Sequence, residues 1–142
     1  KRDTGKPYFP DRPDIFFSPS HTKTHVLCAV SPYPVGADIE TLRPVRFGVA
    51  ERVCAPDELR AFDFFELWVL KESFFKLDGQ TAVPFKKLGF ARRNGAIVAP
   101  DLSGRARLFD GVPGCRAAVC SRGDEIPETA ECVNLSKIIA DA

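Results

Sequence analysis

The chain has 142 residues, a length that fits one domain or two small halves sharing a core. Its 20 lysines and arginines nearly balance 19 aspartates and glutamates, which argues against a bulk nucleic-acid binder. No run approaches the roughly 18 apolar residues that a membrane-spanning helix needs. The five cysteines are odd in number and lack Cys-x-x-Cys spacing, which favours a reducing, cytoplasmic compartment over a disulfide or zinc framework.

The first 40 residues predict an arm, a loop and a hairpin. Residues 1–14 are rich in proline and charge, so they should run as an extended arm. Residues 18–22 are polar and predict a loop. The apolar run 25–30, which contains a cysteine, predicts a buried strand. A proline-rich turn joins it to a second strand at 35–40, and together the two strands predict a hairpin.

The middle of the chain predicts helices. Valines spaced by four give residues 44–53 an amphipathic helical pattern. Pro56, followed by two acids, is typical of a new helix start. Residues 58–77 contain no glycine or proline and form the strongest predicted helix, with a break expected near residues 62–63.

The remainder predicts antiparallel strands. Asn94-Gly95 is the preferred chemistry of a two-residue hairpin turn. Four short strands are expected, at 88–92, 96–99, 105–109 and 116–120. Residues 134–142 should form a terminal helix or fray. The predicted class is α+β, with an antiparallel sheet packed on a long helix.

Two acids share one face of the second strand. Because alternate side chains of a strand point the same way, Asp38 and Glu40 project together, while Ala37 and Ile39 point to the other side. Two such close carboxylates repel each other unless a cation lies between them. Gly36 leaves room for a close approach to the backbone. A solvated strand face is the alternative interpretation of this segment.

A third acid lies on the long helix. Spacing of four places Trp68, Glu72 and Lys76 on one stripe. An exposed ion pair between Glu72 and Lys76 is the plain alternative, worth only about 0.3–0.5 kcal/mol. Magnesium takes oxygen ligands that it shares among a few carboxylates and substrate phosphates. Asp38, Glu40 and Glu72 together therefore predict a site for a hard cation, flanked by two lysines, Lys71 and Lys76, that could offset phosphoryl charge.

Four segments, in order along the chain, resemble motifs of the 4′-phosphopantetheinyl transferases. Residues 36–40 (Gly-Ala-Asp-Ile-Glu) and 68–76 (Trp-Val-Leu-Lys-Glu-Ser-Phe-Phe-Lys) resemble the two signature motifs of that family. Residues 5–9 resemble the glycine-lysine-proline arm of the larger, surfactin-synthetase-activating type, and 17–22 resemble its serine-histidine segment. The resemblance implies the fold of these enzymes and transfer of the phosphopantetheine arm of coenzyme A to an apo acyl or peptidyl carrier protein.

The resemblance also implies roles for individual residues. Asp38, Glu40 and Glu72 would bind Mg²⁺, or Mn²⁺ in its place, together with the coenzyme pyrophosphate. The coenzyme-binding residues would be Lys6, Ser20, His21 and Lys71. Lys76 would stabilise developing charge and protonate the leaving phosphate. The carrier serine needs a carboxylate base, for which Glu58 and Glu72 are the two candidates. By itself, His21 could equally be a capping or surface histidine.

The front of the chain departs from the larger type, which has a half-domain before the arm. We therefore expect either a cropped chain or an intermediate form that self-associates, so that the protein is a monomer or a small homo-oligomer. The expected organisation is an arm, loop and strand of the first half at 1–34, a catalytic module at 35–122 and a tail at 123–142. A non-catalytic module that binds coenzyme A or a carrier protein is the alternative function.

Overall fold

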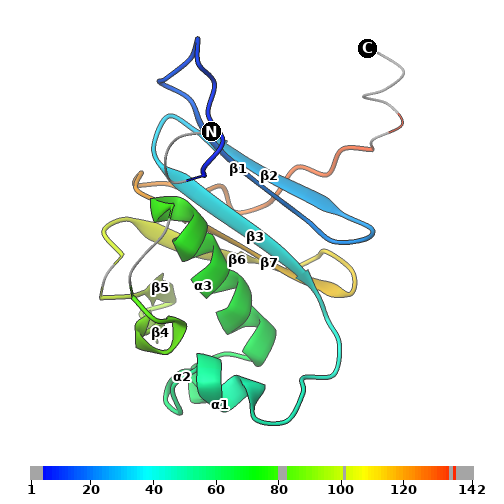
Figure 1. The fold of residues 1–142 in the computed structure, drawn as a ribbon, viewed down its shortest axis with the longest axis vertical. Helices are drawn as coiled ribbons and strands as arrows, with labels where there is room; N and C mark the ends of the chain where they lie inside the picture. Colours follow the sequence, from blue (N-terminus) through cyan, green and yellow to red (C-terminus); the bar gives the residue numbers. More distant parts are fainter. Residues whose placement is uncertain (1–4, 80–82, 101, 135, 137–142) are drawn as a thin grey trace.

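The computed structural model describes residues 5–79, 83–100, 102–134 and 136 (Figure 1). Its elements, in chain order, are β1 (Phe16–His21), β2 (Val26–Ser31), β3 (Val35–Thr41), α1 (Val49–Val53), α2 (Glu58–Ala61), α3 (Phe64–Asp78), the 3-10 helix η1 (Phe85–Lys87), β4 (Ala91–Arg93), β5 (Ala96–Val98), β6 (Arg105–Phe109) and β7 (Cys115–Ser121). The predicted α+β class, with an antiparallel sheet against one long helix, is confirmed.

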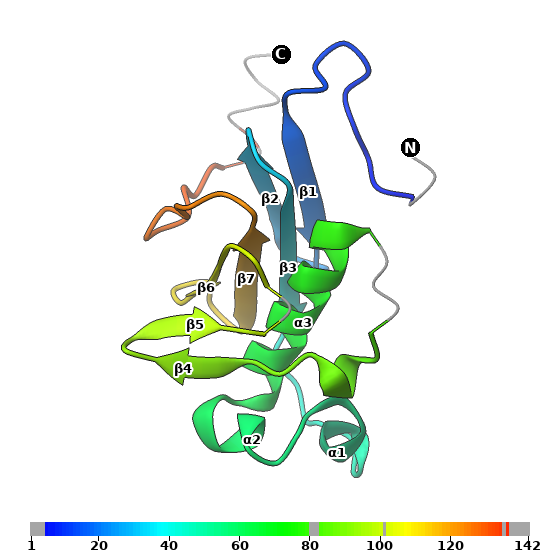
Figure 2. The ribbon, with the colours of Figure 1, turned by 90° about the vertical axis from the view of Figure 1, so that its left-hand side faces the viewer.

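The main sheet is antiparallel and has the strand order β3-β7-β6-β5-β4. Helix α3 packs on one face of it, and the β1–β2 hairpin packs toward the other. Figure 2 shows the β1–β2 hairpin at the opposite end of the molecule from α1 and α2. The strand pair β3–β7, at one edge of the main sheet, therefore has α3 on one face and the hairpin toward the other.

Helix α3 begins at a strong local signal. The side chain of Asp63 accepts a hydrogen bond from the backbone of Glu66, and the Glu66 side chain accepts one from the backbone of Asp63, which is a capping box. Gly79 ends the helix in a left-handed conformation with φ 73°. The predicted break near residues 62–63 is confirmed, because this cap separates α3 from α2. The apolar side of α3 is buried through Leu70, Phe74 and Leu77.

Alternation along β3 separates its two faces. Ala37 and Ile39 are buried with Phe109 on the side of the β1–β2 hairpin. The opposite face turns toward α3, and there Gly36 touches the helix: a Cβ at this position would lie 1.9 Å from the carbonyl oxygen of Ser73. Gly36 thus lets α3 approach β3 closely, and Asp38 and Glu40 follow on the same face.

The predicted pairing of the first two apolar runs is wrong. Residues 18–22 were expected as a loop, but Phe16–His21 forms β1 and pairs with β2, while β3 pairs with β7. The serines of β1 explain why a polar segment is a strand here. The Ser18 hydroxyl accepts a hydrogen bond from Ala37 N (3.0 Å), and the Ser20 hydroxyl accepts one from Ile39 N (3.3 Å).

Three further expectations need correction. The run at 25–30 is not buried, since Val26 is 76% exposed, Val30 is 66% exposed and Cys28 is exposed. The helix expected over 44–53 is only α1, because the chain reaches it through Gly48 in a left-handed conformation. The Asn-Gly hairpin is confirmed, with both turn residues at positive φ. The expectation for 134–142 falls mostly outside the described residues.

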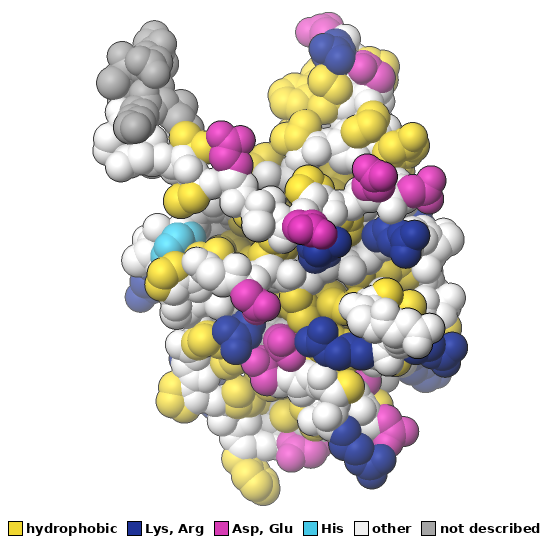
Figure 3. Space-filling model, turned by 180° about the vertical axis from the view of Figure 1, so that it is seen from behind, with side chains coloured by type: hydrophobic (Ala, Val, Ile, Leu, Met, Phe, Trp, Pro, Cys, Tyr) yellow, Lys and Arg dark blue, Asp and Glu magenta, His cyan; other side chains and the backbone are white. Residues whose placement is uncertain are grey.

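On the face seen from behind, acidic and basic side chains are interspersed rather than gathered by sign (Figure 3). That face therefore offers no single-sign field for a polyanion. Within the described ranges, no helix has both the length and the apolar character to cross a bilayer.

Candidate active site

A cavity of about 430 Å³ lies where β1, β3 and α3 meet. Six of the polar residues singled out by the sequence line it: Ser20, His21, Asp38, Glu40, Glu72 and Lys76. Trp68 from α3 and Pro19 and Ile39 from the strands complete the lining. The structure thus brings the strand acids and the helix acid to one cavity, as the sequence predicts.

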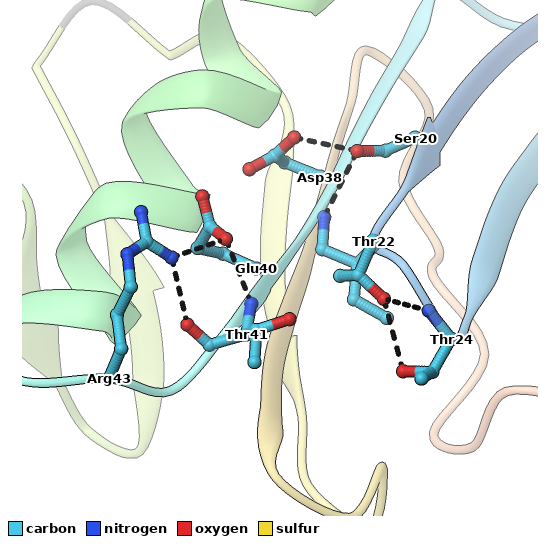
Figure 4. Close-up of polar contacts among 8 residues, drawn as sticks. Ser20, Thr22, Thr24, Asp38, Glu40, Thr41 and Arg43 are labelled. Atoms are coloured by element: carbon cyan, nitrogen blue, oxygen red, sulfur yellow. Dashed lines mark hydrogen bonds and ion pairs between the residues drawn. The ribbon is translucent and has the colours of Figure 1, made fainter.

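Asp38 is the most enclosed of the three acids, with 7% of its surface exposed. Its Oδ1 accepts hydrogen bonds from Ser20 Oγ at 2.8 Å (Figure 4) and from Lys76 Nζ at 2.6 Å. Burial raises the pKa of Asp38, and nearby Glu40 adds to this effect, although Lys76 and Ser20 both favour the carboxylate.

Glu40 projects from the same face of β3 but is held at its outer end (Figure 4). Its Oε1 accepts hydrogen bonds from Arg43 Nη1 at 2.7 Å and from the backbone N–H of Thr41 at 2.9 Å. The Arg43 guanidinium also lies over the ring of Phe65, 5.5 Å from its centroid. The sequence analysis missed Arg43. Residues three apart point to opposite faces of a continuous strand, so the pair with Glu40 forms only because β3 ends at Thr41.

Glu72 differs from the other two acids. Among the described residues, its carboxylate has no hydrogen-bond or ion-pair partner, and the exposed pair with Lys76 that the spacing allows is replaced by the Lys76–Asp38 contact. Burial raises the pKa of Glu72, and the charges of Asp38 and Glu40 raise it further, while Lys76 lowers it. Three acids in one cavity with one lysine between them favour a bound cation.

The donor set suits a hard cation in its chemistry. Asp38, Glu40 and Glu72 supply carboxylate oxygens to the same cavity, and Glu72 leaves its oxygens uncommitted. Within the part of the chain that the structure describes, no three acidic, histidine or cysteine side chains are already gathered at metal-binding distance. Lys76 and Arg43 hold two of the acids instead, so binding a cation would require these side chains to shift.

The predicted coenzyme-binding residues lie in three different settings. Ser20 is buried and bonded to Asp38, whereas His21 is exposed at the cavity edge. Lys6 Nζ donates to the carbonyl oxygens of Val35 (2.8 Å) and Leu77 (3.0 Å). Lys6 also lines a second cavity, of about 310 Å³, which shares lining residues with the first, namely Pro19, Glu72 and Lys76.

Two predicted site residues lie elsewhere. Glu58 and Lys71 form an ion pair of 2.7 Å, with side chains 4% and 0% exposed. Neither residue lines the cavity of the three acids. The structure therefore does not bring Lys71 to a position where it could contact a phosphate there, nor Glu58 to one where it could meet an incoming serine.

The chain is similar in sequence to known proteins. The 4′-phosphopantetheinyl transferase superfamily model matches residues 34–111, more than half of the chain. The Bacillus subtilis (strain 168) protein 4′-phosphopantetheinyl transferase Sfp is 29% identical over 97% of this chain and 69% of its own length. Psf-1 of Bacillus pumilus, also a 4′-phosphopantetheinyl transferase, is 28% identical over 96% of this chain and 65% of its own length.

A solved structure, the Thermotoga maritima holo-[acyl-carrier-protein] synthase, has a TM-score of 0.49 and 23% identity, covering 63% of this chain and 62% of that one. The family match spans β3, all of α3 and the acids that they carry to the cavity. The chain therefore belongs to the 4′-phosphopantetheinyl transferase superfamily and is a transferase of that class.

Proposed function

We propose that this chain transfers the 4′-phosphopantetheine group of coenzyme A to a serine of an apo acyl or peptidyl carrier protein and releases 3′,5′-ADP. The observation that carries the proposal is the cavity shared by Asp38, Glu40, Glu72 and Lys76. Residues so placed suit a pyrophosphate, whose charge must be met by a cation and a lysine.

The proposed cation is Mg²⁺, with Mn²⁺ as a substitute, held by Asp38, Glu40 and Glu72. When bound, it supplies positive charge that neutralises the pyrophosphate. The uncommitted carboxylate of Glu72 and the raised pKa values of Asp38 and Glu72 support this assignment, because both acids gain from a neighbouring positive charge.

The proposed reaction is one phosphoryl transfer. The carrier serine oxygen bonds to the phosphorus that bears pantetheine, and the bond from that phosphorus to the bridging oxygen breaks. A serine hydroxyl is a weak nucleophile at its ordinary pKa, so a carboxylate must take its proton. We assign this step to Glu72, which lines the cavity. Glu58 is buried, and its carboxylate already accepts hydrogen bonds from Lys71 and from the backbone of Phe90.

Lys76 is the proposed acid. Its ammonium is half-buried, lines both cavities and is already hydrogen-bonded to Asp38. Positive charge there stabilises the oxygen that leaves with 3′,5′-ADP. Nζ donates a proton to that oxygen, while Glu72 receives the proton of the serine hydroxyl, so no net charge is gained by the site. Exposed His21 is proposed to contact a coenzyme phosphate. Lys6 is proposed to hold the arm that walls the second cavity.

The test is a transfer assay on the full chain. Apo carrier protein, coenzyme A and Mg²⁺ are incubated with the protein, and the carrier is weighed by mass spectrometry. A phosphopantetheine adduct that is lost with Glu72→Ala and retained with Glu51→Ala, a substitution at an exposed glutamate of α1, supports the proposal.

Two other results would redirect it. Coenzyme binding without an adduct on fatty-acid or peptide-synthesis carriers would favour the non-catalytic binding module. An adduct formed equally well in EDTA would remove the divalent cation from the proposal. The proposed compartment is the cytoplasm, which would keep the exposed thiols of Cys28 and Cys132 reduced.

A further inference from the structure

Glu58 and Lys71 form a network that the reaction proposed above does not use. Lys71 Nζ donates to Glu58 Oε2 (2.7 Å), to the carbonyl of Val53 (3.0 Å) and to the carbonyl of Phe85 (2.8 Å). An ammonium has three protons, and each of these contacts uses one. Lys71 is therefore fully satisfied inside the protein.

The carboxylate of Glu58 is equally committed. Oε2 also accepts from the backbone of Ala55 (2.8 Å), and Oε1 accepts from the backbone of Phe90 (2.9 Å). Burial raises the pKa of neighbouring Cys54 to about 11, the opposing effect of Lys71 being smaller, so this thiol is neutral at physiological pH. Glu58 is thus the charge partner that the structure gives Lys71.

We infer that the Glu58–Lys71 pair is a positioning device, which fixes the rotation of α3 and so holds Glu72 at the cavity. The pair joins the end of α1, the start of α2, the middle of α3, η1 and the residue before β4. Lys71 and Glu72 are neighbours on one helix but point to different sides. The expected effect on turnover rests on the proposed function, whereas the contacts of the pair do not depend on it.

Simple geometry shows why rotation matters. A carboxylate about 6 Å from the helix axis moves by about 1 Å when the helix turns by about 10°. A misplacement of about 1 Å can cost on the order of 100-fold in rate. Gly36 sets the distance between α3 and β3 by its contact with Ser73, and Lys71 adds a polar constraint on the opposite side of the helix.

The test is a double-mutant cycle with Glu58→Gln, Lys71→Met and the two combined. Each single change leaves a buried charge unpaired and is expected to lower Tm by about 10 °C, with a kcat loss of about 10- to 100-fold. The double variant has no buried charge, so it should recover part of both Tm and kcat. Lys87→Met, the same substitution at an exposed lysine of η1, should leave both unchanged.

Coenzyme A affinity, measured by calorimetry without turnover, separates the alternatives. A positioning role predicts a coenzyme Kd within about 3-fold of the wild type in the double variant. Glu58→Gln with wild-type Tm and no turnover would show a direct base. Lys71→Met with wild-type Tm and weakened coenzyme binding would show a phosphate ligand. The inference is also overturned if the Tm of the double variant is no higher than that of the less stable single variant. A double variant that recovers Tm but has no activity overturns it as well. If the wild type itself transfers nothing, the Tm cycle still tests the pair.

Discussion

The ammonium of Lys76 lies 2.6 Å from Asp38 Oδ1, joining α3 to a strand residue 38 positions earlier in the chain. The helical spacing predicts Glu72 as its partner instead, since residues four apart face each other. Asp38 takes the lysine because it is the more buried acid, with few other groups to compensate its charge. If Asp38 holds a divalent cation as proposed, Lys76 would compete with that cation for the Asp38 carboxylate.

We expect Lys76→Met to separate metal binding from turnover. Removing the ammonium frees Asp38, so Mn²⁺ should bind the coenzyme-free protein several-fold more tightly, as measured by titration calorimetry. The same change should lower kcat by about 100-fold, because positive charge at the leaving phosphate is lost. Weaker Mn²⁺ binding in this variant would show that Lys76 supports the cation rather than competing with it.

Gly36→Ala should destabilise the protein strongly. The new Cβ would lie 1.9 Å from the Ser73 carbonyl oxygen and 2.4 Å from Leu77 N, both backbone atoms that cannot swing aside. Overpacking of this kind costs about 3 kcal/mol, readable as a shift in the urea midpoint. Gly89→Ala is the matched control, since a Cβ there meets nothing within 4 Å. Equal effects of the two changes would contradict the close approach of α3.

Glu72→Gln should stabilise the metal-free protein at neutral pH. The folded pKa of Glu72 lies above its ordinary value of 4.5, so the folded state binds more protons than the unfolded state between the two values. The ionised carboxylate thus costs stability as pH rises through that interval. In EDTA, we expect Tm of the variant to exceed wild type by about 1–3 °C at neutral pH.

The advantage of Glu72→Gln should shrink as the pH falls toward 4.5, where the wild-type carboxyl is protonated as well. Glu51→Gln, at an exposed site, should show no such pH-dependent difference. A glutamine variant that is less stable than wild type at neutral pH without metal would mean that burial and repulsion from the other acids do not destabilise the ionised Glu72.

Asp63→Ala should weaken the start of α3. The change removes the capping-box bond to Glu66 N and the two contacts from Arg116 to Asp63 Oδ2. We expect a loss of about 1–2 kcal/mol in the free energy of unfolding. Asp57→Ala is the control, because Asp57 occupies the same position before α2 without a side-chain cap, and its ion pair among the described residues is an exposed one with Arg60. Comparable losses in both variants would argue against the cap.

Local patterns predicted much of the site. Alternation in β3 and the spacing of four in α3 placed Asp38, Glu40 and Glu72 on faces that meet, and Gly36 was expected to permit a close approach. Glu58 and Lys71 could not be placed this way, because the resemblance matches Glu58 to an acid of the family and Lys71 to a motif position but says nothing of their burial. Their contacts come from segments up to 32 residues away, which no local pattern encodes.

The strand pairing shows a second limit. Period-two alternation indicates that a strand has two faces but does not identify its neighbour. Ser18 and Ser20 gave β1 the composition of a loop, since serine usually bonds to its own local backbone. In the fold their hydroxyls bond to amides of β3 instead, a long-range contact that only the tertiary structure reveals.

The cavity is lined from two separate sheets, which meet where the serines of β1 contact β3. Ser20 and His21 belong to the β1–β2 hairpin, whereas the acids and Lys76 belong to the main sheet and its helix. Hydroxyl groups can re-aim by a bond rotation, which a ladder of peptide groups cannot do without losing its register. Among the described residues, the part of the cavity wall that β1 supplies is therefore joined to β3 by serine hydroxyl bonds, whereas the strands within each sheet are joined by backbone ladders.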